Sequence, residues 1–485
     1  MIPLPRRSWL ALVVPGTFAL VLRTAAAGTR PPWHDEYFTA WASRLSWSDL
    51  LAALRLDSGP PLLYVLTHAV SALGFPPLAA ARSLAVLSGV ATVLLTVLAA
   101  RRLWGNGAAW VAGLLLASHP LAVHWGSEAR AYGLLLAAGA WAWERMSRLT
   151  ADGRGSWGLG LAVALGCWAH SLGVILAGAF GVCCLLLPQP ARRPGLLAVA
   201  AGLASHLPWM PVMTTQPTAA IAWMGSLWES LPIPPSRLLA ILRYLPETAA
   251  FGGVLDLPSP PLTVELAGAA MAVALLVLAG RGASHVWLLA PGIVLPVLGF
   301  WLLASLGVPV FYPGRTQAAF LLPFLLLLAA APGRLARVLG LGLATAGLVV
   351  STLALLAWAA APPSAEKLLA LAVRDRLPAG GQVVVGGAWR LGVAFQLQNS
   401  GSRVEPVSYP TAAAAHPGWY VSGYDHPAPG ELEALATRLA ARPAAVIVAP
   451  GADTAGDLRR LAGRLGLRSL PVTPVVELWV PAGLP

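Results

Sequence analysis

The sequence predicts a polytopic α-helical membrane protein with a small soluble α/β domain at its C-terminal end. Of its 485 residues, 57% are hydrophobic and only 11% are charged, and the mean hydropathy is +0.70. Soluble proteins carry roughly 25% charged residues, so this chain belongs to the membrane class. The net charge of +12 comes from arginines scattered in ones and twos between apolar runs, which is typical of cytoplasmic loop ends. We therefore expect the lipid bilayer, and no nucleic acid, as a partner.

About eleven transmembrane helices are expected. Several of the apolar segments are shorter than the roughly 18–20 residues that usually cross a bilayer. The segments cover residues 8–27, 83–100, 108–123, 131–143, 156–170, 171–187, 195–213, 262–280, 285–306, 316–331 and 338–361. The three cysteines, Cys167, Cys183 and Cys184, fall inside these segments, so they are expected to be packing residues rather than disulfides or metal ligands.

The arginines between the segments predict the orientation. With eleven helices and a cytoplasmic N-terminus, every arginine pair in the short connections lies on the cytoplasmic side, as the positive-inside rule requires. This parity holds only if residues 60–74 do not cross the membrane. We therefore expect a large external first loop, residues 28–82, with interfacial helices near 38–45, 48–56 and 60–74. The predicted location is the bacterial inner membrane.

The first apolar segment has a second interpretation. Arg6-Arg7, an apolar run and the small residues Ala25-Ala26-Ala27 also fit a secretory signal with a cleavage site. The segment is about as long as a spanning helix needs to be, so we favour a retained first helix.

After Pro362-Pro363 the sequence changes to an ordinary soluble composition. The predicted domains are thus a transmembrane domain, residues 1–361, and an external α/β domain, residues 362–485. Alternation of strands and helices predicts an α/β layer. The helices are expected at 364–377, 431–441 and 453–465, and the strands at 382–385, 393–397, 445–448 and 475–480.

Four polar features are predicted to lie at the external face: Asp35-Glu36, Asp57 before Ser-Gly-Pro-Pro, the run from Ser127 to Tyr132, and Arg315. Charged residues against a bilayer are costly and indicate a functional site. Arginine binds phosphate through its bidentate fork, and a carboxylate can take a proton from an attacking hydroxyl. Together these groups predict transfer from a phosphate-linked donor, with the phosphate as leaving group.

In the order of its motifs the chain resembles the C-type glycosyltransferase superfamily. The motifs are Trp33-His34-Asp35-Glu36, Pro60-Pro61-Leu62-Leu63-Tyr64, Arg82, Arg101-Arg102-Leu103-Trp104-Gly105 and Ser127-Glu128-Ala129-Arg130-Ala131-Tyr132. It is similar in particular to bacterial polyprenyl-phosphate-sugar transferases related to protein O-mannosyltransferases and lipid A aminoarabinose transferase. The resemblance covers residues 1 to about 360.

The resemblance implies an inverting transfer, in which an acceptor hydroxyl attacks the anomeric carbon of a sugar on a polyprenyl phosphate. Asp35 is then the expected catalytic base or acceptor positioner, with Glu36 supporting it. The expected substrate-binding residues are Glu128, Arg130, Tyr132, Arg315, Tyr64 and Asp57. The aminoarabinose transferases have a lysine where this chain has Gly59, so the donor or its phosphate contacts are expected to differ.

Structural roles compete with each of these assignments. Asp35 could cap a helix that begins at Glu36, Glu128 and Arg130 could form a structural pair, Arg315 could anchor the chain at the membrane interface, and Asp57 could form a turn.

At the level of the whole protein, the alternative function is a transporter or flippase of polyprenyl-linked sugars, although no internal repeat is evident. No metal-binding motif is present and no cofactor is predicted, but a divalent ion held by external histidines and acids remains an alternative. The sugar and the acceptor, whether lipid, glycan or protein, are left open.

Overall fold

The computed structural model describes residues 9–57, 59–216, 224, 234–249, 262–308, 310–387, 389–414, 427–450 and 456–483. Arg6-Arg7 and most of the loop between residues 214 and 261 lie outside these ranges. Two compact units make up the chain. The first unit is Met1–Arg30, Gly59–Thr214 and Ile221–Ala360, and the second is Pro31–Ser58, Thr215–Ala220 and Ala361–Pro485. The second unit thus combines the tail with residues 31–58, which the sequence analysis assigned to the transmembrane domain.

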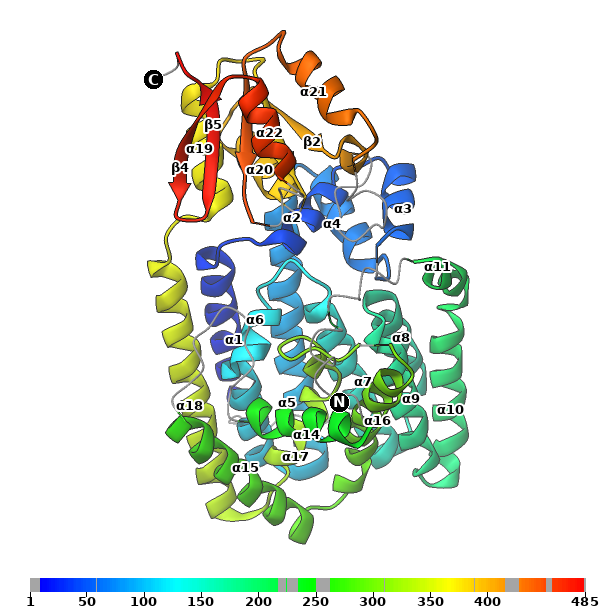
Figure 1. Ribbon diagram of the computed structural model, residues 1–485. Helices are drawn as coiled ribbons and strands as arrows, with labels where there is room; N and C mark the ends of the chain where they lie inside the picture. The colour runs from blue at the N-terminus through cyan, green and yellow to red at the C-terminus, as the bar shows by residue number, and fades with distance from the viewer. Residues whose placement is uncertain are drawn as a thin grey trace. The chain divides into compact units, whose positions relative to one another are not determined.

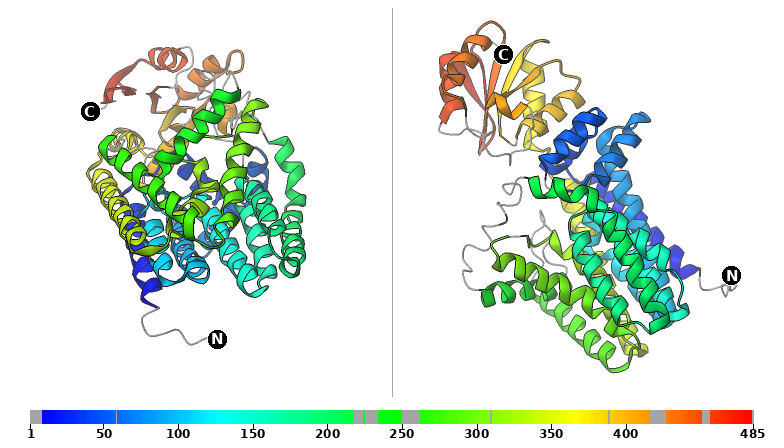
Figure 2. Two further views of the ribbon diagram at one scale, coloured as in Figure 1. Left: turned by 90° about the horizontal axis from the view of Figure 1, so that it is seen from below. Right: turned by 90° about the vertical axis from the view of Figure 1, so that its right-hand side faces the viewer.

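The regular secondary structure of the first unit, over its described residues, consists of helices (Figures 1 and 2). Its helices are α1 (Leu10–Thr29), α4 (Leu62–Ala72), α5 (Pro77–Ser118), α6 (Pro120–Trp125), α7 (Tyr132–Asp152), α8 (Ser156–Ala169), α9 (Leu172–Leu185), α10 (Gln189–Ala204), α11 (Met210–Thr215), α14 (Pro234–Ala249), α15 (Leu262–Gly282), α16 (Ala290–Ser305), α17 (Leu321–Ala329) and α18 (Gly333–Ala360), with short 3-10 turns η1 (Leu207–Trp209), η3 (Val286–Leu288) and η4 (Thr316–Ala319).

Five helical stretches in the described chain are long and apolar enough to cross a membrane. They are Leu10–Thr29, Pro77–Ser118, Gln189–Thr215, Val286–Ser305 and Gly333–Arg376, and shorter apolar helices are Leu62–Ala72, Ser156–Ala169, Leu172–Leu185 and Leu266–Gly282. The expected fold class, a polytopic helical membrane protein, is confirmed. The number of eleven crossings stays a prediction.

Helix α5 contains the turn that the sequence analysis expected between two spans. Its 42 residues would extend about 63 Å as one straight helix, twice the thickness of a bilayer. The helix is interrupted at Gly105, where φ is 83° and ψ is −173°. This conformation is open to glycine and strained for other residues, so Gly105 fixes where the two predicted segments, 83–100 and 108–123, separate.

The segment after Pro60-Pro61, which was predicted to lie at the membrane interface rather than to cross the membrane, forms α4 with 11 residues. At 1.5 Å per residue it extends roughly 16 Å, about half of the hydrocarbon thickness. This length agrees with an interfacial helix rather than a crossing one. The predicted break between the fifth and sixth segments is confirmed, because α8 ends at Ala169 and α9 begins at Leu172.

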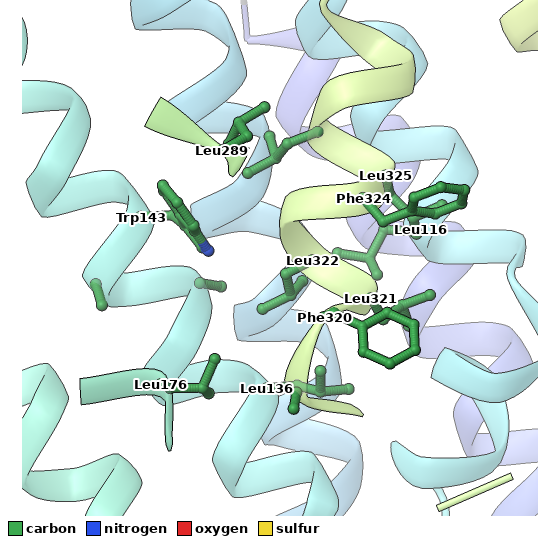
Figure 3. Close-up of a cluster of buried hydrophobic side chains, with 14 of the residues drawn as sticks. Leu116, Leu136, Trp143, Leu176, Leu289, Phe320, Leu321, Leu322, Phe324 and Leu325 are labelled. Carbon is green, nitrogen blue, oxygen red and sulfur yellow. The ribbon is translucent and has the colours of Figure 1, made fainter. Parts of the chain in front are cut away.

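The centre of the first unit is α17. All but one of its nine residues are buried, as expected for a helix that is apolar on every side. Figure 3 shows its side chains among those of neighbouring helices, including Trp143 of α7 and Leu176 of α9. Because α17 is packed on all sides, it fixes the position of the turn η4 and of Arg315, which precede it in the chain.

A buried arginine links α1 to the end of α5. Arg23 is 1% exposed, and its guanidinium donates to the carbonyl oxygens of Leu116 and Ala117, both at 3.1 Å. These carbonyls lie in the last turn of α5, where helical partners are missing. Arg23 therefore satisfies the helix end and joins the two helices.

The second unit contains a five-stranded mixed sheet in the order β2-β1-β3-β5-β4. Figure 1 labels three of its strands, β2, β4 and β5. Strands β1, β2 and β3 are parallel, while β5 runs antiparallel to both β3 and β4. The elements are α2 (His34–Ala42), α3 (Trp47–Arg55), α19 (Ala365–Arg376), β1 (Gln382–Gly386), α20 (Trp389–Asn399), β2 (Glu405–Tyr409), η5 (Thr411–Ala414), α21 (Glu431–Leu439), β3 (Ala444–Val448), α22 (Asp457–Arg464), β4 (Leu467–Thr473) and β5 (Val476–Pro481).

One predicted strand is wrong. Residues 393–397 belong to helix α20, which connects the parallel strands β1 and β2. Parallel neighbours need a crossover, usually a helix, and the short apolar run of α20 did not reveal its period. The same error hid β2, which the sequence analysis did not predict. The predicted strands at 382–385, 445–448 and 475–480 correspond to β1, β3 and β5.

Candidate functional site

Two connections of the first unit are held together where α6 leads into α7. The indole N–H of Trp125, the last residue of α6, donates to the carbonyl oxygen of Gly314 at 3.0 Å. The Trp125 ring also packs on Tyr132, with centroids 5.9 Å apart. Residues 126–131 and the turn before η4 are therefore fixed against each other. They carry Glu128, Arg130 and Arg315.

Glu128 lies in a buried charge network. Its carboxylate is 4.0 Å from a guanidinium nitrogen of Arg30, and both side chains are 2% exposed. The second carboxylate oxygen is 3.6 Å from Nε2 of His124. Arg82, named from the sequence, donates to the carbonyl oxygens of Ala27 at 2.6 Å and Arg30 at 3.0 Å. Arg82 thus holds the end of α1, which places Arg30 beside Glu128.

Arg130 contacts one of the other predicted substrate-binding residues, Tyr64. Its guanidinium donates to the hydroxyl of Tyr64 on α4 at 3.2 Å. Tyr132 packs on the imidazole of His170, with centroids 5.0 Å apart. Tyr64 and Tyr132 are 4% and 7% exposed, whereas Arg130 is partly exposed. The structure therefore pairs Arg130 with Tyr64 and Tyr132 with His170, and the substrate-binding roles of these residues stay predictions.

Positive charge surrounds two of the histidines. Burial, followed by the charges of Arg130 and Arg315, lowers the pKa of His170 to about 3. Burial and the charges of Arg30 and Arg315 hold the pKa of His124 well below its usual range. We call these residues, namely Arg30, His124, Glu128, Arg130, His170 and Arg315, the arginine cluster. Three guanidinium groups accompany one carboxylate, so the cluster is suited to an anionic ligand.

The tautomer of His170 follows from its hydrogen bond. The backbone N–H of Leu172 donates to Nδ1 of His170 at 3.1 Å, so a neutral ring carries its proton on Nε2. Such an imidazole can donate one hydrogen bond to a phosphate or sugar oxygen without adding charge.

The lowered pKa of His170 predicts a pH-dependent stability. Histidine in an unfolded chain titrates near pH 6.5. Below that pH the unfolded chain therefore binds a proton at His170, whereas the folded chain does not. Through this proton the wild type should lose about 1–2 kcal/mol of its free energy of unfolding between pH 7.5 and pH 5. His170→Gln should not show this part of the loss. The measurement is the melting temperature of both proteins across this range. Parallel pH profiles would show that His170 titrates normally when folded.

The predicted catalytic pair belongs to the second unit. Helix α2 begins at His34 with Trp33 as N-cap, so Asp35 and Glu36 occupy the first turn. The alternative that Asp35 caps a helix from Glu36 is wrong, because the helix starts two residues earlier. Asp35 is partly exposed and Glu36 is fully buried. Carboxylates in a first helical turn interact favourably with the helix dipole.

Asp57 also belongs to the second unit and is 4% exposed. Its backbone N–H bonds to the carbonyl oxygen of Leu54 at the end of α3, as a turn residue would. Asp35, Glu36 and Asp57 are thus grouped in one unit, and Tyr64, Glu128, Arg130, Tyr132 and Arg315 in the other. Among the described residues, no group of three His, Cys, Asp or Glu side chains is arranged to hold a metal ion.

Known proteins match this chain in sequence over one region and in fold over nearly all of it. Residues 58–214 match the family model described as dolichyl-phosphate-mannose-protein mannosyltransferase. The crystal structure of ArnT from Cupriavidus metallidurans bound to undecaprenyl phosphate superposes with a TM-score of 0.51 at 15% identity, covering 98% of each chain. The chain shares the fold of this ArnT structure. The expected resemblance is thereby confirmed.

Two further solved structures are similar. ArnT from the same organism in the apo state has a TM-score of 0.49 at 15% identity, with 96% of this chain and 97% of that chain covered. The archaeal oligosaccharyltransferase AglB from Archaeoglobus fulgidus, in complex with an inhibitory peptide and a dolichol-phosphate, has a TM-score of 0.49 at 11% identity, with 91% and 69% covered. None of the curated proteins matches the chain in sequence.

Sequence reasoning missed Arg30 as part of the site, and it considered His124 and His170 only among the external histidines that could hold a metal ion. His124 precedes Glu128 by four residues, a spacing that would have suggested a pair if α6 had been predicted to continue toward Glu128. Arg30 follows the end of the first apolar segment and reads as an interface anchor. His170 stood out only as an external histidine between two apolar segments, and its contact with Tyr132 depends on the tertiary structure.

Proposed function

We propose that this protein transfers a sugar from a polyprenyl-phosphate donor to an acceptor hydroxyl, and that the arginine cluster binds the donor phosphate. The observation that carries the proposal is the arginine cluster: Arg30 lies 4.0 Å from Glu128, and the charges of Arg30, Arg130 and Arg315 act on the buried histidines His124 and His170. Support also comes from the family match, which spans Tyr64 to Tyr132, and from a similar fold that was crystallised with undecaprenyl phosphate.

The chemistry proposed is an inverting displacement. The acceptor oxygen attacks the anomeric carbon and forms the new glycosidic bond, while the bond from that carbon to the phosphate oxygen breaks. The electron pair leaves with the phosphate, whose growing negative charge the arginines stabilise. The proton of the acceptor hydroxyl goes to a base, and we propose the carboxylate of Asp35 for this role. Glu36, which is buried in the next position, is proposed to support Asp35.

The substrate-binding roles are proposed on the same basis. Arg315 and Arg130 would contact phosphate oxygens directly, since both are partly exposed. Glu128 would hold Arg30 in place, and the rings of Tyr64 and Tyr132 would line the donor. Asp57 is retained as a proposed binding residue of the first loop, which we place, with the second unit, at the outer face of a bacterial inner membrane.

The decisive experiment is release of polyprenyl phosphate by the purified full-length protein. A panel of polyprenyl-phosphate sugars is supplied in sealed proteoliposomes that contain the protein, with a membrane extract as the source of acceptors. Release together with incorporation of the sugar would establish transfer and identify the donor. Movement of the donor across the bilayer without cleavage would instead support a flippase.

Replacement of Arg315 by methionine tests the phosphate site. A charge-assisted hydrogen bond contributes roughly 1.5–3 kcal/mol, so we expect donor KM to rise about 10- to 100-fold. The matched control is Arg281→Met, which removes an exposed arginine from the last turn of α15 and should leave KM unchanged. Equal donor KM values in the two variants would exclude Arg315 from phosphate binding.

A further inference from the structure

Helix α2, which carries Asp35, is docked on helix α20 of the C-terminal tail. Tyr37 of α2 is 1% exposed, and its ring packs on Phe395 of α20 with centroids 5.2 Å apart. The side-chain amide of Gln396 donates to the Tyr37 hydroxyl at 3.2 Å. Both helices belong to the second unit.

Helix α2 packs so closely on α20 that there is no space for a side chain at Gly392 of α20. A Cβ atom added to Gly392 would lie 2.9 Å and 3.2 Å from two carbons of the Tyr37 ring and 2.6 Å from Cγ of Glu366. Contacts below 3.0 Å essentially never occur between carbon atoms that are not bonded. Glycine at position 392 is therefore what allows the Tyr37 ring to lie against the backbone of α20.

A second contact extends the docking beyond the end of α2. Arg44 hydrogen-bonds to the side chain of Gln398, and its guanidinium lies 5.8 Å from the centroid of the Phe395 ring, a distance at which cations and aromatic rings attract each other. Burial raises the pKa of Tyr37 to about 12, so the docked phenol stays neutral at physiological pH.

The geometry of α2 relates this docking to Asp35. Residues two positions apart in a helix point roughly 200° away from each other. When Tyr37 faces α20, Asp35 consequently faces away from it, in agreement with the partial exposure of Asp35. A rotation of α2 about its axis would displace the Asp35 carboxylate directly.

We propose that α20 sets the orientation of α2 through Tyr37, so that the tail after Ala360 serves as the platform that positions Asp35. The inference rests on the proposed function, and it gives a role to a tail for which the sequence offered none. Tyr37 is a positioning residue, because it acts through Asp35 rather than on the substrate.

The test compares Gly392→Ala with Gly463→Ala in the full-length protein. Both changes replace a helical glycine and raise helix propensity equally, but a Cβ on Gly463 of α22 meets no atom within 4 Å. Gly392→Ala should accelerate amide hydrogen exchange of residues 34–42 about 10-fold or more. It should also lower kcat about 10-fold with donor KM within about twofold of wild type, since the phosphate site is unchanged. Gly463→Ala should alter neither quantity.

A double variant attributes the effect to Tyr37. In a Tyr37→Ala background the ring is absent, so Gly392→Ala should add little to the loss of kcat that Tyr37→Ala already causes. Full additivity would show that Gly392→Ala acts elsewhere. Should Gly392→Ala fail to fold, Gln396→Ala removes the hydrogen bond to Tyr37 without adding an atom and should change exchange and kcat in the same direction.

The remaining outcomes separate the proposal from the function on which it rests. Unchanged exchange of residues 34–42 in Gly392→Ala would overturn the docking itself. Faster exchange with wild-type kcat would overturn the positioning role. Absence of polyprenyl phosphate release by the wild type would refute the proposed transfer, and with it the role for Asp35, while exchange would still report whether α20 holds α2.

Discussion

Asp35→Asn is expected to lower kcat for sugar transfer roughly 10²- to 10⁴-fold, the usual contribution of a general base. Asparagine preserves the size and the helix position of Asp35 but cannot accept a proton at neutral pH. Because the arginine cluster is untouched, donor binding should persist. The measurement is polyprenyl phosphate release under saturating donor, combined with a donor-binding assay on the same preparations.

Asp49→Asn provides the matched control. Asp49 lies in the first turn of α3, as Asp35 does in α2, and accepts a hydrogen bond from Ser46. Its loss should cost the helix at most about 1 kcal/mol and leave kcat unchanged. Full activity of Asp35→Asn would remove Asp35 from the mechanism, and an equal loss in both variants would indicate damage to the second unit.

Glu128→Ala should destabilise the first unit by about 3–5 kcal/mol, because it removes the carboxylate that lies beside the buried guanidinium of Arg30. Both side chains are 2% exposed, so water cannot replace the lost partner. The measurement is thermal unfolding of the detergent-solubilised protein, followed by circular dichroism. Transfer activity should fall as well, since Arg30 belongs to the cluster proposed to bind phosphate.

The control for Glu128 is a closer but exposed ion pair. Arg102 and Asp152 are 2.8 Å apart, with exposures of 31% and 50%. Exposed pairs contribute about 0–1 kcal/mol, so Asp152→Ala should hardly move the melting temperature. If Glu128→Ala were equally mild, the buried network would contribute no more than a surface pair, and its role would have to be in substrate binding alone.

The fold of the membrane part was predictable because each helix there depends mainly on its own composition. The predicted segments reappear in the structure as α1, both halves of α5, α7 to α10 and α15 to α18, since apolar runs of this length have few alternatives in a bilayer. The tail was predicted less well. Residues 393–397 were assigned to a strand, because a short buried run fits a strand and a helix equally, and only the pairing of β1 with β2 decides.

The residue types of the candidate site could be predicted from the sequence, but the contacts between these residues could not. Asp35, Glu128, Arg130 and Arg315 stand out because charge beside apolar segments is costly. Their partners depend on tertiary contacts over long sequence distances, such as Arg30 with Glu128 and Arg130 with Tyr64. No local pattern indicates such pairs. The docking of Tyr37 on α20, more than 350 residues later in the chain, likewise follows only from the three-dimensional structure.

Arg23 bears on the order in which the protein can be assembled during synthesis. An arginine within a membrane-spanning helix is costly in lipid until it finds a partner. Its carbonyl partners at the end of α5 are made 93 and 94 residues later, a delay of roughly 5–20 seconds at the usual rates of translation. During that interval the Arg23 side chain lacks these carbonyl partners, and α1 is expected to remain beside the translocon or near the membrane surface. Arg23 of α1 thus gains its hydrogen-bond partners only after the last turn of α5 has been synthesised.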